Sequence, residues 1–328
     1  FCEYGDASGT GWLDVGRRRW SPELLRAIDP DRDLSQCLPP LVDTARTFPI
    51  RADRAEQLGL ASDIVVATGG GDNMMAAIGT GCVAPGRLVM SLGTSGTLFA
   101  YSDTPAVDPT GRWAAFCSST GGWLPLICTM NCTVATETIA RLFGFSTRDG
   151  DIHITATEPG AGGITLLPFL NGERTPDLPL AKGALTGLTP HNASAANFYR
   201  AAMEGATYTL KHGFEAFASA GMKFDHIVLT GGGAGSAAWR QMVADVFNLP
   251  VAVPRDVEGA AFGAALQALW SLSNAQGADV TFAELVDTHV TLDDALACKP
   301  DADRVKAYQE PYQRFLDHLV SVKQIYAA

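Results

Sequence analysis

Three apolar segments that each end in a run of glycines constrain the fold of this chain more than any other feature. They are VVATGGGDN (65–73), MSLGTSGT (90–97) and IVLTGGGAGSAAW (227–239). In each segment the aliphatic residues predict a buried strand, and the glycines predict a sharp turn at its end. Because glycine has no Cβ, such a turn lets backbone N–H groups approach a ligand and cradle a phosphate. Taken singly, each segment is more often a plain tight turn.

Around these segments the pattern alternates between strands and helices, which favours an α/β fold. Further strands are expected at 87–92, 97–101, 113–118 and 123–129, and residues 145–163 are expected to form a polar loop. Helices are expected at 131–144, 193–220, 236–247, 258–272 and 304–324. A cluster of glycine and proline at 79–86 predicts a domain boundary, with residues 1–84 in a first domain and 85–328 in a second.

Composition narrows the function classes. The 328 residues carry 24 Lys and Arg against 35 Asp and Glu, a net charge of −11, and 47% of them are hydrophobic. The length favours two domains, and the acidic balance argues against binding to nucleic acid or to an anionic membrane. No apolar run reaches the roughly 18–20 residues that cross a bilayer, and no signal peptide is visible, so a cytoplasmic location is expected. The seven cysteines form no CxxC pair, which predicts a reducing compartment and no structural metal.

The glycine turns fit none of the common nucleotide motifs. A P-loop requires Gly-Lys followed by Ser or Thr, and this sequence contains no such triplet. The run Gly231–Ser236 loosely resembles a dinucleotide-binding fingerprint, with Glu258 near the distance expected for a ribose-binding acid. A dinucleotide-dependent oxidoreductase therefore stays open as an alternative.

One segment carries a specific resemblance to a known family. GALTGLTPHNASAANFYRAAME (183–204) resembles the signature of the FGGY carbohydrate kinases, and the three glycine turns follow in that family's order. Within the family, FLNGERTPDLPLAKG (169–183) and DASGTGWLDV (6–15) are most similar to xylulokinases. The resemblance implies an actin-like ATPase (ribonuclease H-like) α/β fold of two domains, with ATP in the cleft between them. It also implies an opening strand–Asp-x-Gly-Thr–strand hairpin, which does not precede Asp6, so we expect the first domain to be incomplete.

The resemblance assigns the sugar-binding and catalytic roles to TGGGDN. Asp72 would be the general base that accepts the proton of the attacking hydroxyl, and it would also contact the substrate. The alternative is that Asp72 caps the helix that follows. Asn73 would hydrogen-bond the sugar hydroxyls, because an amide both donates and accepts, and its alternative is simple turn chemistry.

The nucleotide roles fall on the other two turns. The resemblance implies that ATP, with Mg²⁺, contacts Gly93, Thr94, Ser95, Gly96, Asn131, Gly232, Gly233, Ala234 and Ser236. The alternatives are a plain hairpin turn at 93–96 and a helix N-cap at Asn131. Trp239 is a weaker candidate that also suits core packing, and no residue is assigned as a metal ligand.

Three charged residues near the signature are expected to be structural. Glu173 and Arg174 would form a buried ion pair that orders the cleft, or a solvated surface pair that contributes little. Glu204 would pair with Arg174 or Lys182.

The implied reaction is transfer of the γ-phosphoryl group of ATP to a terminal hydroxyl of a ketopentose, D-xylulose giving D-xylulose 5-phosphate. Other acceptors in the same family are ribulose, gluconate and glycerol. A catalytically silent nucleotide-binding fragment is the alternative from another class, favoured by the missing hairpin. The expected partners are the sugar and ATP, and a homodimer stays open.

Overall fold

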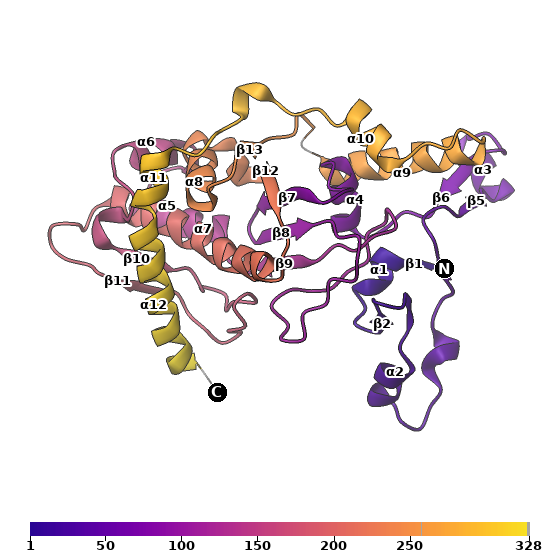
Figure 1. Ribbon diagram of the computed structural model, residues 1–328, viewed down its shortest axis with the longest axis horizontal. Helices are drawn as coiled ribbons and strands as arrows, with labels where there is room; N and C mark the ends of the chain where they lie inside the picture. The colour runs from indigo at the N-terminus through magenta and orange to yellow at the C-terminus, as the bar shows by residue number, and fades with distance from the viewer. Residues whose placement is uncertain (257, 327–328) are drawn as a thin grey trace.

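A five-stranded sheet organises the molecule, and the computed structural model describes residues 1–256 and 258–326 (Figure 1). Its strand order is β13-β12-β7-β8-β9. The strands are β7 (Gly86–Leu92), β8 (Gly96–Ala100), β9 (Leu126–Thr129), β12 (Phe224–Thr230) and β13 (Val251–Ala252). β7, β8 and β9 pair antiparallel in succession, whereas β12 runs parallel to β7 and β13 parallel to β12. This topology confirms the expected α/β fold.

Side chains of β7 alternate between two cores, one on each face of the sheet. Leu88, Met90 and Leu92 join one cluster, and Val89 joins the other, as a period of two requires. Helices α5 (Thr133–Phe143), α7 (Ala195–Ser219) and α8 (Ala237–Phe247) contribute to the first cluster. Helices α4 (Asp72–Gly79) and α9 (Gly259–Ala275) contribute to the second. The sheet is therefore the middle of three layers.

Helices α4 and α9 approach each other as closely as their main chains permit. A Cβ on Gly263 would overlap the carbonyl oxygen of Met75, and a Cβ on Gly79 would overlap that of Gly259. Residues without a Cβ are thus required on both sides of this contact. The contact fixes α4 against a helix that comes nearly two hundred residues later in the chain.

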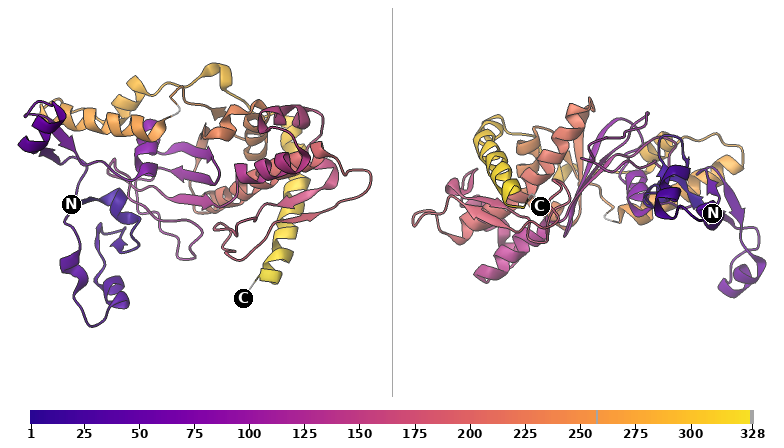
Figure 2. Two further views of the ribbon diagram at one scale, coloured as in Figure 1. Left: turned by 180° about the vertical axis from the view of Figure 1, so that it is seen from behind. Right: turned by 90° about the horizontal axis from the view of Figure 1, so that it is seen from below.

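The first 67 residues form small elements at the end of the long axis opposite the C-terminal helix (Figure 2). Three two-stranded sheets, β1–β4, β2–β3 and β5–β6, join them. Ser21 caps its helix by accepting the N–H of Leu24, and Pro22 follows in the first turn, where no N–H is needed. The elements are β1 (Cys2–Glu3), α1 (Tyr4–Ser8), β2 (Leu13–Asp14), β3 (Arg19–Trp20), α2 (Pro22–Ile28), η1 (Leu34–Cys37), β4 (Leu41–Val42), β5 (Thr47–Pro49), α3 (Ala52–Leu58) and β6 (Val65–Ala67).

The remaining elements belong to the second half of the chain, after β9. The hairpin of β10 (Thr165–Leu167) and β11 (Ala184–Thr186) follows the short α6 (Gly150–Thr155). The others are η2 (Thr147–Asp149), η3 (Ala161–Gly163), η4 (Gly232–Gly235), α10 (Phe282–His289), η5 (Asp294–Leu296), α11 (Ala302–Ala307) and α12 (Gln309–Tyr326).

Three sequence expectations were wrong in detail. Residues 113–118 form only isolated bridges, not a strand. The loop expected at 145–163 contains α6, which packs Ile154 into the core. The helix expected at 304–324 is two helices, because Pro311 lacks the N–H that one continuous helix would need.

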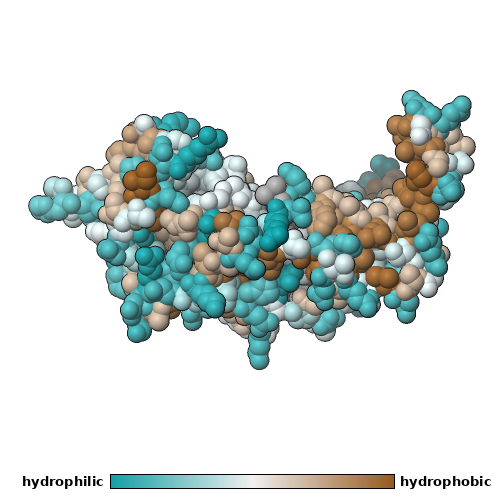
Figure 3. Space-filling view, turned by 90° about the horizontal axis from the view of Figure 1, so that it is seen from above, coloured by the Kyte–Doolittle hydropathy of each residue, from teal (hydrophilic) through white to brown (hydrophobic). Residues whose placement is uncertain are grey.

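The surface holds apolar side chains at the end that carries α3, β5, β6 and α9 (Figure 3). The exposed aliphatic residues include Leu58, Leu60, Val65, Val66, Leu269 and Leu272. Among the described helices, none is both long and apolar enough to cross a membrane.

Candidate functional site

Two of the three glycine turns lie side by side because β7 and β12 are parallel neighbours. Ser91 of β7 pairs with Thr230 of β12, so the two strands end together. The turn at 93–96 and the turn at 231–235 therefore meet at one edge of the sheet. The carboxyl ends of strands are where α/β sheets bind ligands.

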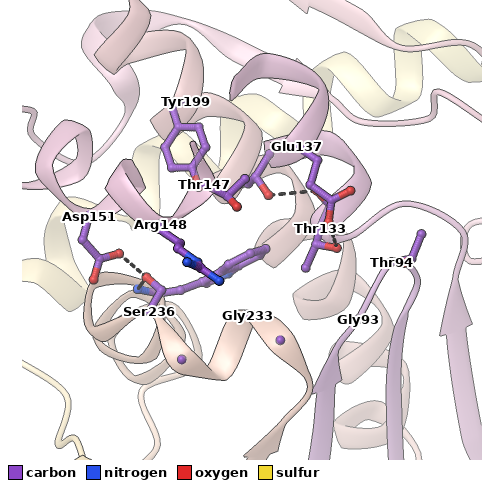
Figure 4. A pocket seen from close by; sticks show the side chains of 14 residues that line it. Gly93, Thr94, Thr133, Glu137, Thr147, Arg148, Asp151, Tyr199, Gly233 and Ser236 are labelled. Carbon is purple, nitrogen blue, oxygen red and sulfur yellow. Dashed lines mark hydrogen bonds between the residues drawn. The ribbon is translucent and has the colours of Figure 1, made fainter. Parts of the chain in front are cut away.

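A cleft of about 680 Å³ opens between these two turns and the helices α5, α6, α7 and α8 (Figure 4). Five residues predicted to bind ATP line it: Gly93, Thr94, Gly232, Gly233 and Ser236. Trp239 lines it too, although its side chain is almost completely buried. Sequence reasoning missed the other lining residues, which are Thr133, Thr136, Glu137, Thr147, Arg148, Asp151, Tyr199 and Gly235.

Both glycine turns are held by main-chain contacts. Gly231 has φ of +82°, and a Cβ there would lie 2.7 Å from the main chain of Leu92. The carbonyl oxygens of Gly93 and Thr94 accept the N–H groups of Thr133 and Cys132, both at 2.9 Å. The first turn is thereby tied to the start of α5, and the second to the end of β7.

Asp151 gives the cleft an electrostatic direction. Its carboxylate accepts the Ser236 hydroxyl and, at 3.3 Å, the backbone N–H of Ala238 (Figure 4). Ser236 in turn accepts the N–H of Trp239 and caps α8. A carboxylate at a helix N-terminus neutralises the site that would otherwise attract a phosphate. Asp151 thus occupies the start of α8, and the lining also holds the cation Arg148 and the carboxylate of Glu137, which bonds to the Thr133 hydroxyl at 2.9 Å.

Four residues predicted to bind ATP lie outside the lining of this cleft. Ser95 is exposed at the tip of its hairpin, and the Gly96 N–H is bonded to the Thr129 hydroxyl at 3.1 Å. Ala234 is buried in η4. Asn131 is fully buried as well.

The side chain of Asn131 is used in holding a loop. Its amide donates to the carbonyl of Gly172 at 2.7 Å and to Glu173 Oε2 at 3.0 Å, and its oxygen accepts the N–H of Asn171 at 3.1 Å. The N-cap reading was wrong, because α5 begins at Thr133 with Cys132 as its N-cap. Asn131 thus holds the 171–173 loop.

Asp72 and Asn73 lie in the first turn of α4. The N-cap of this helix is Gly71, so the capping alternative for Asp72 was wrong. Asp72 Oδ1 accepts both the N–H of Asn73 at 2.7 Å and its side-chain amide at 3.0 Å. The Asp72 carboxylate is exposed, on an element that does not line the 680 Å³ cleft.

The turn before Asp72 rests against α1. Glu3 caps α1 by accepting the N–H of Gly5 at 2.9 Å, and it also accepts the Ser119 hydroxyl at 3.0 Å. A Cβ on Gly70 would lie 2.6 Å from Ser119 Oγ and 3.2 Å from Glu3 Oε2. Burial raises the pKa of Glu3 above its ordinary value. This buried carboxyl escaped the sequence analysis, although it lies three residues before the DASGT segment.

The expected Glu173–Arg174 ion pair is absent from the described ion pairs. Glu173 is buried and accepts backbone N–H groups from Met130 at 2.5 Å and from Arg174 at 2.8 Å. Its charge is met by amides, and burial raises its pKa. Glu173 is thus a loop anchor together with Asn131.

Glu204 pairs with neither Arg174 nor Lys182. It lies 3.4 Å from Arg200, one helical turn earlier, and accepts the N–H of Gly160 at 2.9 Å. Both side chains of this pair are buried. Desolvation raises the pKa of Glu204 to about 7, although the Arg200 charge opposes the shift. Its structural role was anticipated, but its partner was not.

The donor set offers no ready-made metal centre. Across residues 1–256 and 258–326, no three His, Cys, Asp or Glu side chains are grouped to hold a metal ion. Magnesium that travels with a nucleotide needs only one or two protein carboxylates, since phosphates and water supply its other ligands. The residues present do not define which carboxylates those would be.

Comparison with known proteins identifies the class. Residues 88–272 match the C-terminal domain of the FGGY family of carbohydrate kinases, and residues 1–79 match its N-terminal domain. The chain belongs to the FGGY family of carbohydrate kinases and has its α/β fold. A separate dinucleotide-dependent oxidoreductase is thereby set aside.

Within that family, the similar proteins include xylulose kinases. The xylulose kinase of Haemophilus influenzae is 43% identical over 321 residues, which are 97% of this chain and 64% of the relative. The crystal structure of a xylulose kinase from Brucella ovis has a TM-score of 0.88 and 32% identity, over 99% of this chain and 65% of that one. Plasmodium falciparum glycerol kinase with ADP shares the fold, with a TM-score of 0.83 at 14% identity, over 97% and 63% of the two chains. This chain thus spans about 64% of the length of its curated relative.

Proposed function

We propose that this chain is part of an ATP-dependent kinase that phosphorylates a terminal hydroxyl of a ketopentose, most specifically D-xylulose. The observation that carries the kinase proposal is the meeting of two glycine turns, Gly93–Thr94 and Gly232–Gly233, at one cleft. The choice of xylulose is supported by the 43% identity to a xylulose kinase. We also propose a domain boundary near residue 84, which lies between the two matched ranges.

In this proposal the nucleotide lies along the cleft with its phosphates toward Gly93 and Thr94. The nucleoside lies against Gly232, Gly233 and Ser236, which line the cleft from the second glycine turn. The presence of ADP in the structure of Plasmodium glycerol kinase supports nucleotide binding by this fold. Magnesium bound to the phosphates would offset the charge that develops during transfer.

Asp72 is the proposed general base. Its Oδ1 is engaged by Asn73, whereas its Oδ2 makes no hydrogen bond within the described part of the chain and is available to a substrate hydroxyl. Phosphoryl transfer needs mainly positioning and one carboxylate near the attacking oxygen. Asn73 would orient both the base and the sugar, because its amide already contacts the carboxylate.

The direct test compares Asp72→Asn with Asp63→Asn, a control at an exposed aspartate nine residues earlier. ADP release is followed in a coupled assay with xylulose, ribulose, gluconate or glycerol, and ATP binding is followed by calorimetry. We expect Asp72→Asn to lose phosphorylation by about 10²-fold or more while ATP binding and the control stay unchanged. Near-normal turnover of Asp72→Asn would refute its role as base, and a faster rate with another acceptor would refute xylulose.

A second candidate is a nucleotide-binding module without catalysis. The observation that favours it is length, because the chain covers only about 64% of its relative. Calorimetry with ATP in the presence and absence of xylulose separates the two. ATP binding without any sugar-dependent change, together with no ADP release, would support the silent module.

A further inference from the structure

One buried side chain bonds to both the N–H and the carbonyl of Gly69, in the turn just before Asp72. Gln267, on α9, is 1% exposed. Its Oε1 accepts the N–H of Gly69 at 3.1 Å, and its Nε2 donates to the carbonyl of Gly69 at 2.8 Å. The same nitrogen lies 3.3 Å from the Thr68 hydroxyl. Gly69 therefore receives from one amide the two bonds that a neighbouring strand would otherwise supply.

The chemistry of this contact suits an amide. Gly69 has φ of +69°, and β6 ends two residues earlier, so the sheet ladder does not continue to it. The partner both accepts and donates at fixed spacing, and the amide of Gln does so without charge at any pH. Leaving either group unpaired in a partly buried turn carries a desolvation penalty.

Gln267 acts from a fixed position. The next turn of α9 toward its N-terminus carries Gly263, whose close contact with Met75 sets the distance between α9 and α4. On its other side the turn is bounded by Ser119 and Glu3, which lie against Gly70. Residues 69–71 are thus held from two sides, and Asp72 follows directly.

We propose that Gln267 is a positioning residue: through its paired hydrogen bonds to Gly69 it fixes the turn that places the Asp72 carboxylate. The inference rests on the proposed function for the role of Asp72 in catalysis. The contact itself is independent of that role. Gln267 does not touch the cleft and acts only through the main chain.

The test uses two substitutions and two measurements. Gln267→Met keeps the length of the side chain and removes both hydrogen bonds. Gln267→Glu keeps the acceptor, but at high pH it places a carboxylate against the Gly69 carbonyl. Hydrogen–deuterium exchange of the peptide covering residues 66–73 reports on the turn, and kcat and KM report on catalysis. Ser271→Ala, one turn further along α9, is the matched control because its buried hydroxyl has no partner within the described residues.

We expect Gln267→Met to raise exchange in 66–73 and to lower kcat about tenfold or more, with little change in KM for ATP. Gln267→Glu should behave likewise at pH 8. Burial should raise the pKa of the introduced carboxyl above that of a free Glu, so protonation restores the donor as the pH falls. When the pH is lowered from 8 to 6, the exchange protection of residues 66–73 and the kcat of Gln267→Glu should therefore both return toward the values of the parent.

Unchanged exchange in Gln267→Met would overturn the proposal, as would raised exchange with an unchanged kcat. A Ser271→Ala variant with the same losses would overturn it too, because the effect would then belong to α9 in general. If the parent phosphorylates no sugar, the proposed function fails, and exchange with its pH recovery alone decides whether Gln267 fixes the turn.

Discussion

Replacing Gly263 by alanine should separate α9 from α4 and displace the proposed base. Besides overlapping the Met75 carbonyl oxygen, the new Cβ would lie 2.7 Å from Gly79 N and from the Met75 carbonyl carbon. Carbon atoms in ordinary contact are about 3.5 Å apart or more, so the carbonyl carbon alone requires α4 to retreat by roughly 0.8 Å, and the closer carbonyl oxygen requires more. The obstacle is helical main chain, which cannot rotate aside as a side chain can.

Two effects of opposite sign set the change in the free energy of unfolding of Gly263→Ala. Overpacking of this kind costs about 1–3 kcal/mol or somewhat more, and alanine gains about 1 kcal/mol over glycine inside a helix. Since the overlap is with backbone, the first effect wins, and we expect a net loss of about 2 kcal/mol. Gly259→Ala on the same helix is the control, because its Cβ would meet only Thr80 Cγ2 at an ordinary 3.5 Å. That variant should be neutral or more stable by up to about 1 kcal/mol.

Urea unfolding followed by circular dichroism measures both variants, and the coupled kinase assay measures the displacement of Asp72. Gly263→Ala should unfold at lower urea than the parent and should lose kcat. Gly259→Ala should do neither. An unfolding midpoint for Gly263→Ala equal to or above that of Gly259→Ala would refute the packing argument.

Three further variants test other parts of the structure. The raised pKa of Glu204, about 7, means that its contribution to stability is greatest below its ordinary pKa and is lost as pH rises through 7. As the pH rises from 4.5 to 8, the free energy of unfolding of Glu204→Gln should therefore rise relative to that of the parent by up to about 3 kcal/mol, measured by urea unfolding. A difference between variant and parent that does not change with pH would contradict this. Asn131→Ala should cost about 1–3 kcal/mol by leaving buried groups unpaired, with ATP affinity by calorimetry unchanged; weaker ATP binding would instead support phosphate contact. Trp239→Phe, which loses a 2.9 Å bond to Thr207, should lower stability by about 2 kcal/mol, and an unchanged urea midpoint would count against its core role.

Much of the fold could be predicted because its signals are local. The alternation of Leu88, Val89 and Met90 and the glycines that follow predict a central strand and its turn from adjacent residues alone. The pairing of β7 with β12 could not be derived in this way, since more than one hundred residues separate them. The resemblance to a family supplied their order, and the parallel register supplies the physical reason why two turns form one cleft.

The residues of the candidate site also divide into those with a local signal in the sequence and those without one. Gly93, Thr94, Gly232 and Gly233 have a local conformational signature and were predicted. Arg148, Asp151 and Tyr199 were missed, because neighbouring residues in the sequence do not show that a polar side chain on a helix faces another element. Asn131 was assigned to ATP by the family resemblance, and its bonds to the distant 171–173 loop have no signal in the adjacent sequence.

Glu204 is a different case, because its partner had a signal in the sequence. Arg200 lies four residues earlier, which is the spacing of neighbours on a helix. The local pair was available, and the longer-range pairing with Arg174 or Lys182 was preferred to it wrongly.

The bond between Gly69 and Gln267 has a consequence for the order of folding, since the two residues are 198 positions apart in the sequence. Contacts so distant close a long loop and form late, after local helices and hairpins. Asp72 is synthesised well before α9, because the chain is made from its N-terminus. The proposed base therefore exists for a time without the helix that fixes its turn. If Asp72 is the base, as proposed, catalytic competence would arrive no earlier than residue 267, long after the Asp72 carboxylate has been made.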